Sequence, residues 1–155
     1  MLESAMQLAI QSARQGVKEN DGGPFGAVIV RNNQVISVAH NTVLKDHDPT
    51  CHAEMNAIRK ACKHLNTHIL KDCELYTTTE CCPMCFSAIY WARIPKIYIG
   101  TPKSIAAQYD FDDVLIYEEL AKPLEKRLIS CQTGIMMEEV ESVFKEWKAL
   151  ERVLY

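Results

Sequence analysis

The sequence has no apolar run approaching the roughly 20 residues that a membrane-spanning helix requires, so we expect no membrane association. No basic segment followed by an apolar stretch occurs near Met1, and no secretory signal is expected. No internal repeat, low-complexity tract or linker rich in proline, glycine or serine interrupts the 155 residues. Because domains commonly span about 100–200 residues, we predict one domain over residues 1–155.

An excess of positive charge is also absent. The chain has 17 Lys and Arg residues against 20 Asp and Glu residues, for a formal net charge of −3. Proteins that bind nucleic acids over a broad face concentrate basic side chains there. This balance therefore argues against a nucleic-acid partner.

Cysteine is abundant but follows no pairing pattern. The seven cysteines are an odd number at irregular spacings, at positions 51, 62, 73, 81, 82, 85 and 131. This usage favours reduced thiols and metal ligation over a disulfide framework. We therefore predict a cytoplasmic location.

Hydrophobic periodicity predicts helices that alternate with strands. An amphipathic helix opens the chain up to Val17, and a hairpin follows with strands at 25–30 and 35–39. A second helix is expected from Asp48-Pro49-Thr50 to about Leu65, because proline suits the first helical turn. The remaining predicted elements are strands at 73–78, 97–99 and 128–132 and helices at 83–92, 104–109, 114–121 and 138–152.

This order of elements predicts an α/β fold. Strands that alternate with helices require parallel pairing through crossover connections, whereas the opening hairpin is antiparallel. We therefore expect three layers, α/β/α, around a mixed five-stranded sheet. Residues 122–155 are long enough to fold back on their own site or to reach a partner subunit, and the sequence leaves both arrangements open.

Two short segments carry residue types that bind zinc. Cys51-His52-Ala53-Glu54 stands near the start of the second predicted helix, and Cys82-Pro83-Met84-Cys85 leads into the third. A Cys-x-x-Cys pair at a helix start can direct two thiolates to one tetrahedral ion, and the helix N-terminus favours their anionic form. We predict one Zn²⁺ ion per subunit, held by His52, Cys82 and Cys85. Water or hydroxide is expected at the fourth position, as in catalytic zinc sites.

Glu54 follows His52 by two residues, so its carboxylate can reach the open coordination position without occupying it. Zinc lowers the pKa of bound water towards about 7, and an adjacent carboxylate can take up and pass on the released proton. Glu54 is therefore the predicted general acid and base. A water nucleophile and a proton carrier are what hydrolytic removal of ammonia from an amino-heterocycle requires.

The order His-x-Glu followed by Pro-Cys-x-x-Cys is typical of zinc-dependent deaminases, and this sequence matches it except that Cys81 replaces the proline. Over almost its whole length the chain resembles the cytidine-deaminase-like superfamily, and within it the bacterial guanine deaminases. The segments that carry the resemblance are 22–30, 48–54, 58–62, 82–85, 88–93 and 111–113. The resemblance implies a cytidine-deaminase-like fold, hydrolysis of guanine to xanthine and ammonia, and a homodimer.

The resemblance also implies the residues of a purine pocket. Asn41 and the backbone of Ala53 would contact the base, and Phe25 would pack on its face. Asp113 would act as a second catalytic residue at the departing 2-amino group, and Tyr155 would close the pocket. Structural alternatives stay open for three of them: Asp113 can cap a helix, Asn41 can form a turn, and Tyr155 can be a frayed terminus.

Two cysteines bear on the zinc assignment. Cys81 stands where the family usually has proline and can compete as a ligand, but Cys82 has the usual register against the helix start. Cys51 precedes His52, and we interpret it as a small packed apolar side chain.

The zinc motifs are shared by other activities. A tRNA adenosine deaminase has them too, but segment 138–152 holds five glutamates against three basic residues, which disfavours a phosphate-binding arm. Deaminases of guanosine or cytosine differ in pocket walls that the sequence does not reveal. A structural-zinc interaction module would need a fourth ligand, such as Cys81 or Cys51, and would leave Glu54 without a role.

Overall fold

The structure, a computed structural model, describes residues 2–152. It divides into two units, one ending at Asp113 and the other beginning at Val114. The predicted metal ligands and all but one of the other predicted site residues belong to the first unit. The exception, Tyr155, lies outside the described residues.

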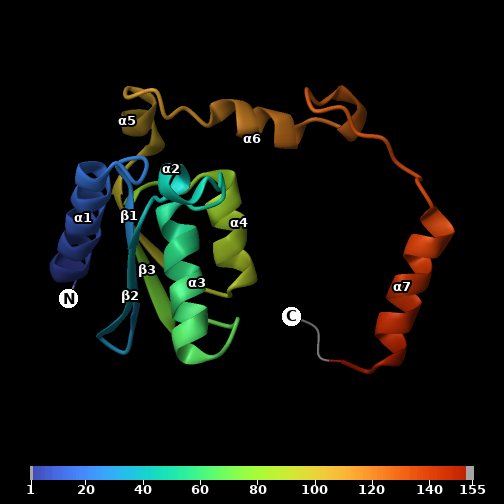
Figure 1. The fold of residues 1–155 in the computed structure, drawn as a ribbon, viewed down its shortest axis with the longest axis horizontal. Helices are drawn as coiled ribbons and strands as arrows, with labels where there is room; N and C mark the ends of the chain where they lie inside the picture. Colours follow the sequence, from blue (N-terminus) through green and yellow to red (C-terminus); the bar gives the residue numbers. More distant parts are fainter. Residues whose placement is uncertain (1, 153–155) are drawn as a thin grey trace. The chain divides into compact units, whose positions relative to one another are not determined.

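The first unit contains a mixed sheet with the strand order β2-β1-β3-β4 (Figure 1). The strands are β1 (Gly26–Arg31), β2 (Gln34–His40), β3 (Cys73–Thr79) and β4 (Lys96–Thr101). β1 pairs antiparallel with β2 and β3, and β3 pairs parallel with β4. The strands β2, β3 and β4 therefore run in one direction, and their carboxyl ends meet at one edge of the sheet.

A tight turn joins β1 to β2, which confirms the predicted hairpin. Asn32 and Asn33 at the turn have positive φ angles of 49° and 62°. Asparagine adopts this left-handed conformation more readily than most residues, and two such residues match the twist of a two-residue hairpin. Arg31 pairs with Gln34 across the turn.

Helices cover both faces of the sheet, as predicted (Figure 1). On one face α1 (Leu2–Glu19) buries alanines at four-residue spacing against β1 and β3. Gly26 permits this close approach, because a Cβ there would lie 1.9 Å from the Ala9 carbonyl oxygen. On the other face α3 (Ala53–Leu65) and α4 (Pro83–Trp91) share a core with Ile29 and Leu75.

The second predicted helix begins later than expected, and the start at Asp48-Pro49-Thr50 is wrong. Asp48 Oδ1 accepts hydrogen bonds from the backbone N–H and the hydroxyl of Thr50, each at 2.7 Å, which forms a turn in place of a helical turn. A short helix not predicted from the sequence, α2 (Val43–Asp46), precedes this turn. As a result His52 becomes the N-cap residue of α3.

The later helices correspond to prediction, but the fifth strand does not form. The helices are α5 (Lys103–Ala107), α6 (Val114–Ala121) and α7 (Met137–Ala149), with a short 3-10 helix, η1 (Leu124–Lys126), between the last two. Residues 128–132 form no strand, and Leu128 and Ile129 are 73% and 80% exposed. A strand needs hydrogen bonds to a neighbouring strand, which apolar composition alone does not supply. Within residues 2–152, no helix combines the length and apolar character needed to cross a membrane.

Candidate active site

The predicted site residues meet because they adjoin one edge of the sheet. Asn41 follows the carboxyl end of β2, and Glu80 follows that of β3. Phe25 precedes β1, which runs in the opposite direction, so it arrives at the same edge. In open α/β sheets, ligands bind outside the carboxyl ends of the strands.

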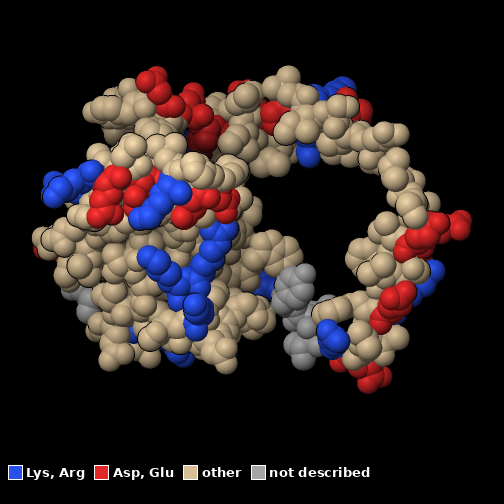
Figure 2. Space-filling view, in the orientation of Figure 1, with Lys and Arg blue, Asp and Glu red and all other residues tan. Residues whose placement is uncertain are grey.

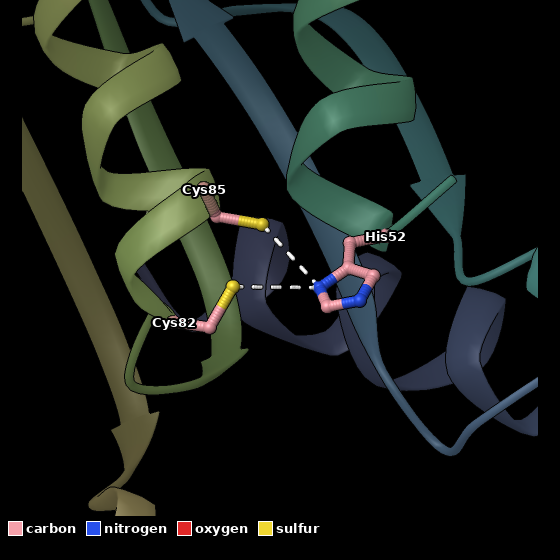
Figure 3. Close-up of side chains that lie close together, drawn as sticks. All are labelled: His52, Cys82 and Cys85. Carbon is pink, nitrogen blue, oxygen red and sulfur yellow. Dashed lines mark hydrogen bonds between the residues drawn. The ribbon is translucent and has the colours of Figure 1, made fainter. Parts of the chain in front are cut away.

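Two helix starts place the candidate metal ligands (Figure 3). His52 is the N-cap residue of α3 and Cys82 that of α4, both with extended backbone, and Cys85 lies in the first turn of α4. Pro83 determines where α4 begins, because its φ angle suits the first helical position and that position needs no N–H donor. In Figure 3 both sulfur atoms point towards the His52 ring.

These three side chains have spacings that fit zinc. Nδ1 of His52 lies 3.6 Å from Sγ of Cys82 and 3.6 Å from Sγ of Cys85. The three candidate ligand atoms all lie within 4.8 Å of one another. Tetrahedral zinc, with Zn–S of about 2.3 Å and Zn–N of about 2.0 Å, places its ligand atoms about 3.5 Å apart. The donor types and their separations therefore suit one zinc ion.

The thiol pKa of Cys82 is lowered, whereas those of Cys51, Cys81 and Cys85 are raised. A hydrogen bond from the Cys85 side chain, assisted by His52, lowers the pKa of Cys82 to about 4. The thiolate is the form that binds metal. Burial raises the pKa of the Cys81 and Cys51 thiols, and neither belongs to the described ligand group. The hydrogen bond to Cys82, followed by burial, raises the pKa of the Cys85 thiol as well. The preference for Cys82 over Cys81 as a ligand therefore rests on position, because Cys81 lies outside the group of three candidate ligands.

Glu54 lies in the first turn of α3, close to this group. It is only 6% exposed, and burial raises the pKa of its carboxyl. Thr77 donates a hydrogen bond of 3.2 Å to Oε1, and the Cys85 sulfur lies 3.6 Å from Oε2. A carboxyl with a raised pKa holds a proton more readily than an exposed one and can deliver it during a reaction.

A cavity of about 520 Å³ brings together residues that are far apart in the sequence. Its lining includes two of the three candidate metal ligands, the buried Glu54 and three of the predicted substrate or catalytic residues: His52, Cys82, Glu54, Phe25, Asn41 and Asp113. Ala53 is fully buried between His52 and Glu54 and is not among the described lining residues. The predicted contact of its backbone with a base stays a prediction.

Asn41 has one side of its amide occupied by the protein. Its Oδ1 accepts hydrogen bonds from the backbone N–H groups of Gly23, at 3.2 Å, and Val43, at 3.1 Å. Gly22 must be glycine here, because a Cβ would lie 2.1 Å from that oxygen. The bonds to Oδ1 fix the orientation of the amide and leave its NH₂ group as the donor for a ligand.

Aromatic and acidic residues complete the wall. The rings of Phe25 and Phe111 meet edge to face, with centroids 4.9 Å apart and an interplanar angle of 86°. Asp113 is partly buried, and this burial, assisted by the charge of Cys82, raises the pKa of its carboxyl. Asp113 therefore combines a position in the cavity with a carboxyl that is easier to protonate than an exposed one.

Sequence reasoning missed several residues of this site. Thr77 reaches Glu54 because alternate residues of β3 face the same side, and that alternation was the available signal. Glu80 and Lys103 also line the cavity, and the Lys103 backbone N–H donates a hydrogen bond of 3.1 Å to Glu80 Oε2. No motif marks Lys103, because the fold brings it next to Glu80.

A hydrogen-bond network centred on Asp21 holds the segments that form part of the cavity wall. The Asp21 carboxylate accepts hydrogen bonds of 2.9 Å from His40 Nε2 and from Lys45 Nζ. The Asp21 carbonyl oxygen accepts the backbone N–H groups of Leu44 and Lys45, each at 3.0 Å. Asn41 and Leu44 line the cavity. Through these hydrogen bonds, Asp21 holds the end of β2 and the start of α2, which flank them, in fixed positions.

Comparisons with known proteins agree with this site. A family model described as the cytidine and deoxycytidylate deaminase zinc-binding region matches residues 1–101. A guanine deaminase of Bacillus subtilis (strain 168) is 44% identical over 146 residues, which cover 94% of this chain and 93% of that protein. An X-ray structure of guanine deaminase from Bacillus subtilis matches with a TM-score of 0.91 at 44% identity, covering 95% of this chain and 93% of that one. A tRNA-specific adenosine deaminase of Aquifex aeolicus (strain VF5) is 44% identical over 95 residues, covering 61% of this chain and 62% of that protein.

Proposed function

The chain belongs to the cytidine and deoxycytidylate deaminase zinc-binding family, and we propose that it is a zinc-dependent aminohydrolase that converts guanine and water to xanthine and ammonia. The observation that carries this proposal is one cavity lined by His52, Cys82, a buried glutamate and a second carboxyl, with Cys85 completing the candidate metal group beside Cys82. The similarity to a guanine deaminase over nearly the whole chain supports guanine as the substrate.

His52, Cys82 and Cys85 would hold the zinc ion. When bound, zinc supplies a Lewis acid that activates water for attack on the ring carbon bearing the amino group. Glu54 takes the proton released by the water and transfers it to the adjacent ring nitrogen. The carboxylate then takes the proton of the hydroxyl group added to that carbon and transfers it to the amino group, so that the carbon–nitrogen bond breaks as the carbonyl forms, and ammonia leaves. The raised pKa of Glu54 suits both directions of transfer.

The remaining wall residues would hold the purine. The NH₂ group of Asn41 donates to an acceptor on the base, since its oxygen is already bonded to the protein. Phe25 packs on the face of the base, and its edge-to-face contact with Phe111 holds the ring in position. Asp113 assists departure of the 2-amino group, while Ala53 and Tyr155 contribute a backbone contact and a closing side chain.

Ammonia release tests the proposal. The substrates are guanine, guanosine, cytosine, adenine and a tRNA anticodon stem-loop bearing adenosine, each given to the zinc-loaded protein. We expect turnover of guanine. Turnover of another substrate but not of guanine would support zinc-dependent deamination and contradict the assignment of a guanine pocket. Absence of any turnover with zinc bound would favour a structural role for the metal.

We further propose a cytoplasmic homodimer in which residues 122–155 contact the partner subunit. All seven cysteines are free thiols, which suits a reducing compartment. Val143 and Phe144 of α7 are 61% and 70% exposed, and such apolar surface is typical of an interface. Sedimentation would establish the dimer. Recovery of activity on mixing a Glu54→Gln subunit with one lacking Tyr155 would place Tyr155 in the partner's site, and no recovery would place it in its own.

A further inference from the structure

Volume alone does not restrict the cavity to a free base. At about 520 Å³ it lies within the range of about 300–1,000 Å³ that is usual for small-molecule sites. A nucleoside or nucleotide carries the same base and presents it to the same zinc-type group. Selection among a free base, a nucleoside and a nucleotide therefore requires a property of the cavity wall other than its volume.

The charged side chains of the wall are mostly acidic. Apart from the metal group and Glu54, the cavity is lined by the carboxylates of Glu80, Asp110, Asp112 and Asp113 and by one ammonium group, that of Lys103, for a formal charge of −3. Figure 2 shows acidic side chains over α5 and the segment that follows it, whereas basic side chains gather over α3. None of the basic residues of α3 is among the described residues that line the cavity.

Several contacts hold these acidic residues at the wall. Glu80 accepts the Lys103 backbone N–H at 3.1 Å. Asp110 and Asp112 flank Phe111, whose ring packs against Phe25 and whose N–H bonds to the Ala106 carbonyl oxygen at 3.1 Å. The match to the zinc-binding family model ends at residue 101, so three of the four acidic residues lie beyond the region that the family model describes.

Resting on the proposed function, we propose that Glu80, Asp110 and Asp112 form an acidic rim that selects against substrates carrying phosphate. A phosphate monoester has a charge of about −1.5 to −2 at neutral pH. Like charges repel, and the field of a cleft lined by one sign of charge is concentrated by its low-dielectric walls. Uncharged bases and nucleosides experience no such repulsion. The rim therefore disfavours nucleotides and RNA at a site whose zinc chemistry accepts an amino-heterocycle.

The test compares guanosine 5′-monophosphate with guanosine as inhibitors of guanine turnover at low ionic strength. The variant combines Asp110→Asn, because asparagine tolerates the positive φ of 67° at this position, with Asp112→Lys. We expect the inhibition constant of the nucleotide to fall by at least about tenfold and that of guanosine to change by less than about twofold, with the difference diminishing as salt is added. The matched control is Asp72→Lys, at the opposite end of β3, which should change neither constant.

Three outcomes would contradict the proposed role of the acidic rim. These are an equal fall in the inhibition constants of both ligands, no inhibition of the variant by the nucleotide, and a nucleotide that already binds the wild type as well as guanosine does. Failure of the proposed function is a separate result, because it appears as absent guanine turnover in the wild type. In that event equilibrium dialysis of the zinc-loaded proteins against the same two ligands tests the rim without relying on activity.

Discussion

Glu54 is buried beside the candidate metal ligands, and a carboxylate on the surface would lack the raised pKa that this burial produces. Burial destabilises its charged form and raises its pKa, while Thr77 gives it one hydrogen bond that fixes its direction. A carboxyl with a raised pKa holds a proton more readily than a surface carboxyl, which suits a group that must act as an acid as well as a base.

Replacing Glu54 with Gln should abolish proton transfer and keep the shape of the site. General acid–base catalysis is worth about 100- to 10,000-fold, so kcat for guanine should fall by that factor. The zinc content of the variant, measured by atomic absorption, should equal that of the wild type. A variant that kept most of its turnover would remove Glu54 from the mechanism.

Cys81 and Cys82 offer a second test at the residue scale. Because Cys81 lies outside the group of three candidate ligands, Cys81→Ala should keep the full zinc content. Cys82→Ala, the matched control, should lose the metal together with its low-pKa thiol. Loss of zinc from the Cys81→Ala variant would indicate that Cys81 is a zinc ligand.

At the scale of elements, the site depends on how loops are fixed after strands. The segment before β1 and the segment after β2 form one wall, and Asp21 joins them through His40, Lys45 and the first turn of α2. The hydrogen bond from Lys45, and then that from His40, lowers the pKa of Asp21 below its ordinary value of 3.8.

This lowered pKa predicts a dependence of stability on acid. A group whose pKa is lower in the folded state stabilises that state fully above its unfolded pKa, and loses the contribution as pH falls through the folded value. The wild type should therefore melt at a higher temperature than Asp21→Asn at pH 7, and the gap should narrow below about pH 4. Calorimetry across this range measures it; a gap that stays constant down to pH 2 would contradict the assignment. If the wall holds the base as proposed, the variant should also raise KM more than it lowers kcat.

At the scale of the whole molecule, zinc would link α3 and α4, two helices that pack on the same face of the sheet but make few direct contacts with each other. His52 starts α3 and Cys82 starts α4, so one ion would fasten both to the same edge of the sheet. Metal that binds only the folded state stabilises it by mass action.

Zinc removal should consequently lower the melting temperature. At a zinc concentration 100 times its dissociation constant the contribution is about 2.7 kcal/mol, which corresponds to about 5–10 °C for a domain of this size. Melting curves with and without a chelator measure the shift. The Cys82→Ala variant should melt at the same temperature under both conditions, and a shift of equal size in that variant would locate the stabilising metal elsewhere.

The sequence by itself determined the chemistry and most of the elements of this protein. Local patterns were sufficient for the hairpin, for the helix that begins at Pro83 and for the candidate ligands His52, Cys82 and Cys85, because turn residues, caps and ligand spacing act over a few residues. Local patterns also misplaced the start of α3, where the bonds from Thr50 to Asp48 form a turn.

Only the tertiary structure decided what surrounds that chemistry. Thr77, Lys103 and Asp110 reach the site because β2, β3 and β4 end at one edge, a consequence of strand order that no short motif encodes. The strand predicted at 128–132 failed for the same reason, since pairing requires a neighbour supplied by the fold. Spacing along the chain therefore identified the candidate reacting groups, whereas the volume and charge of the cavity arose from long-range packing.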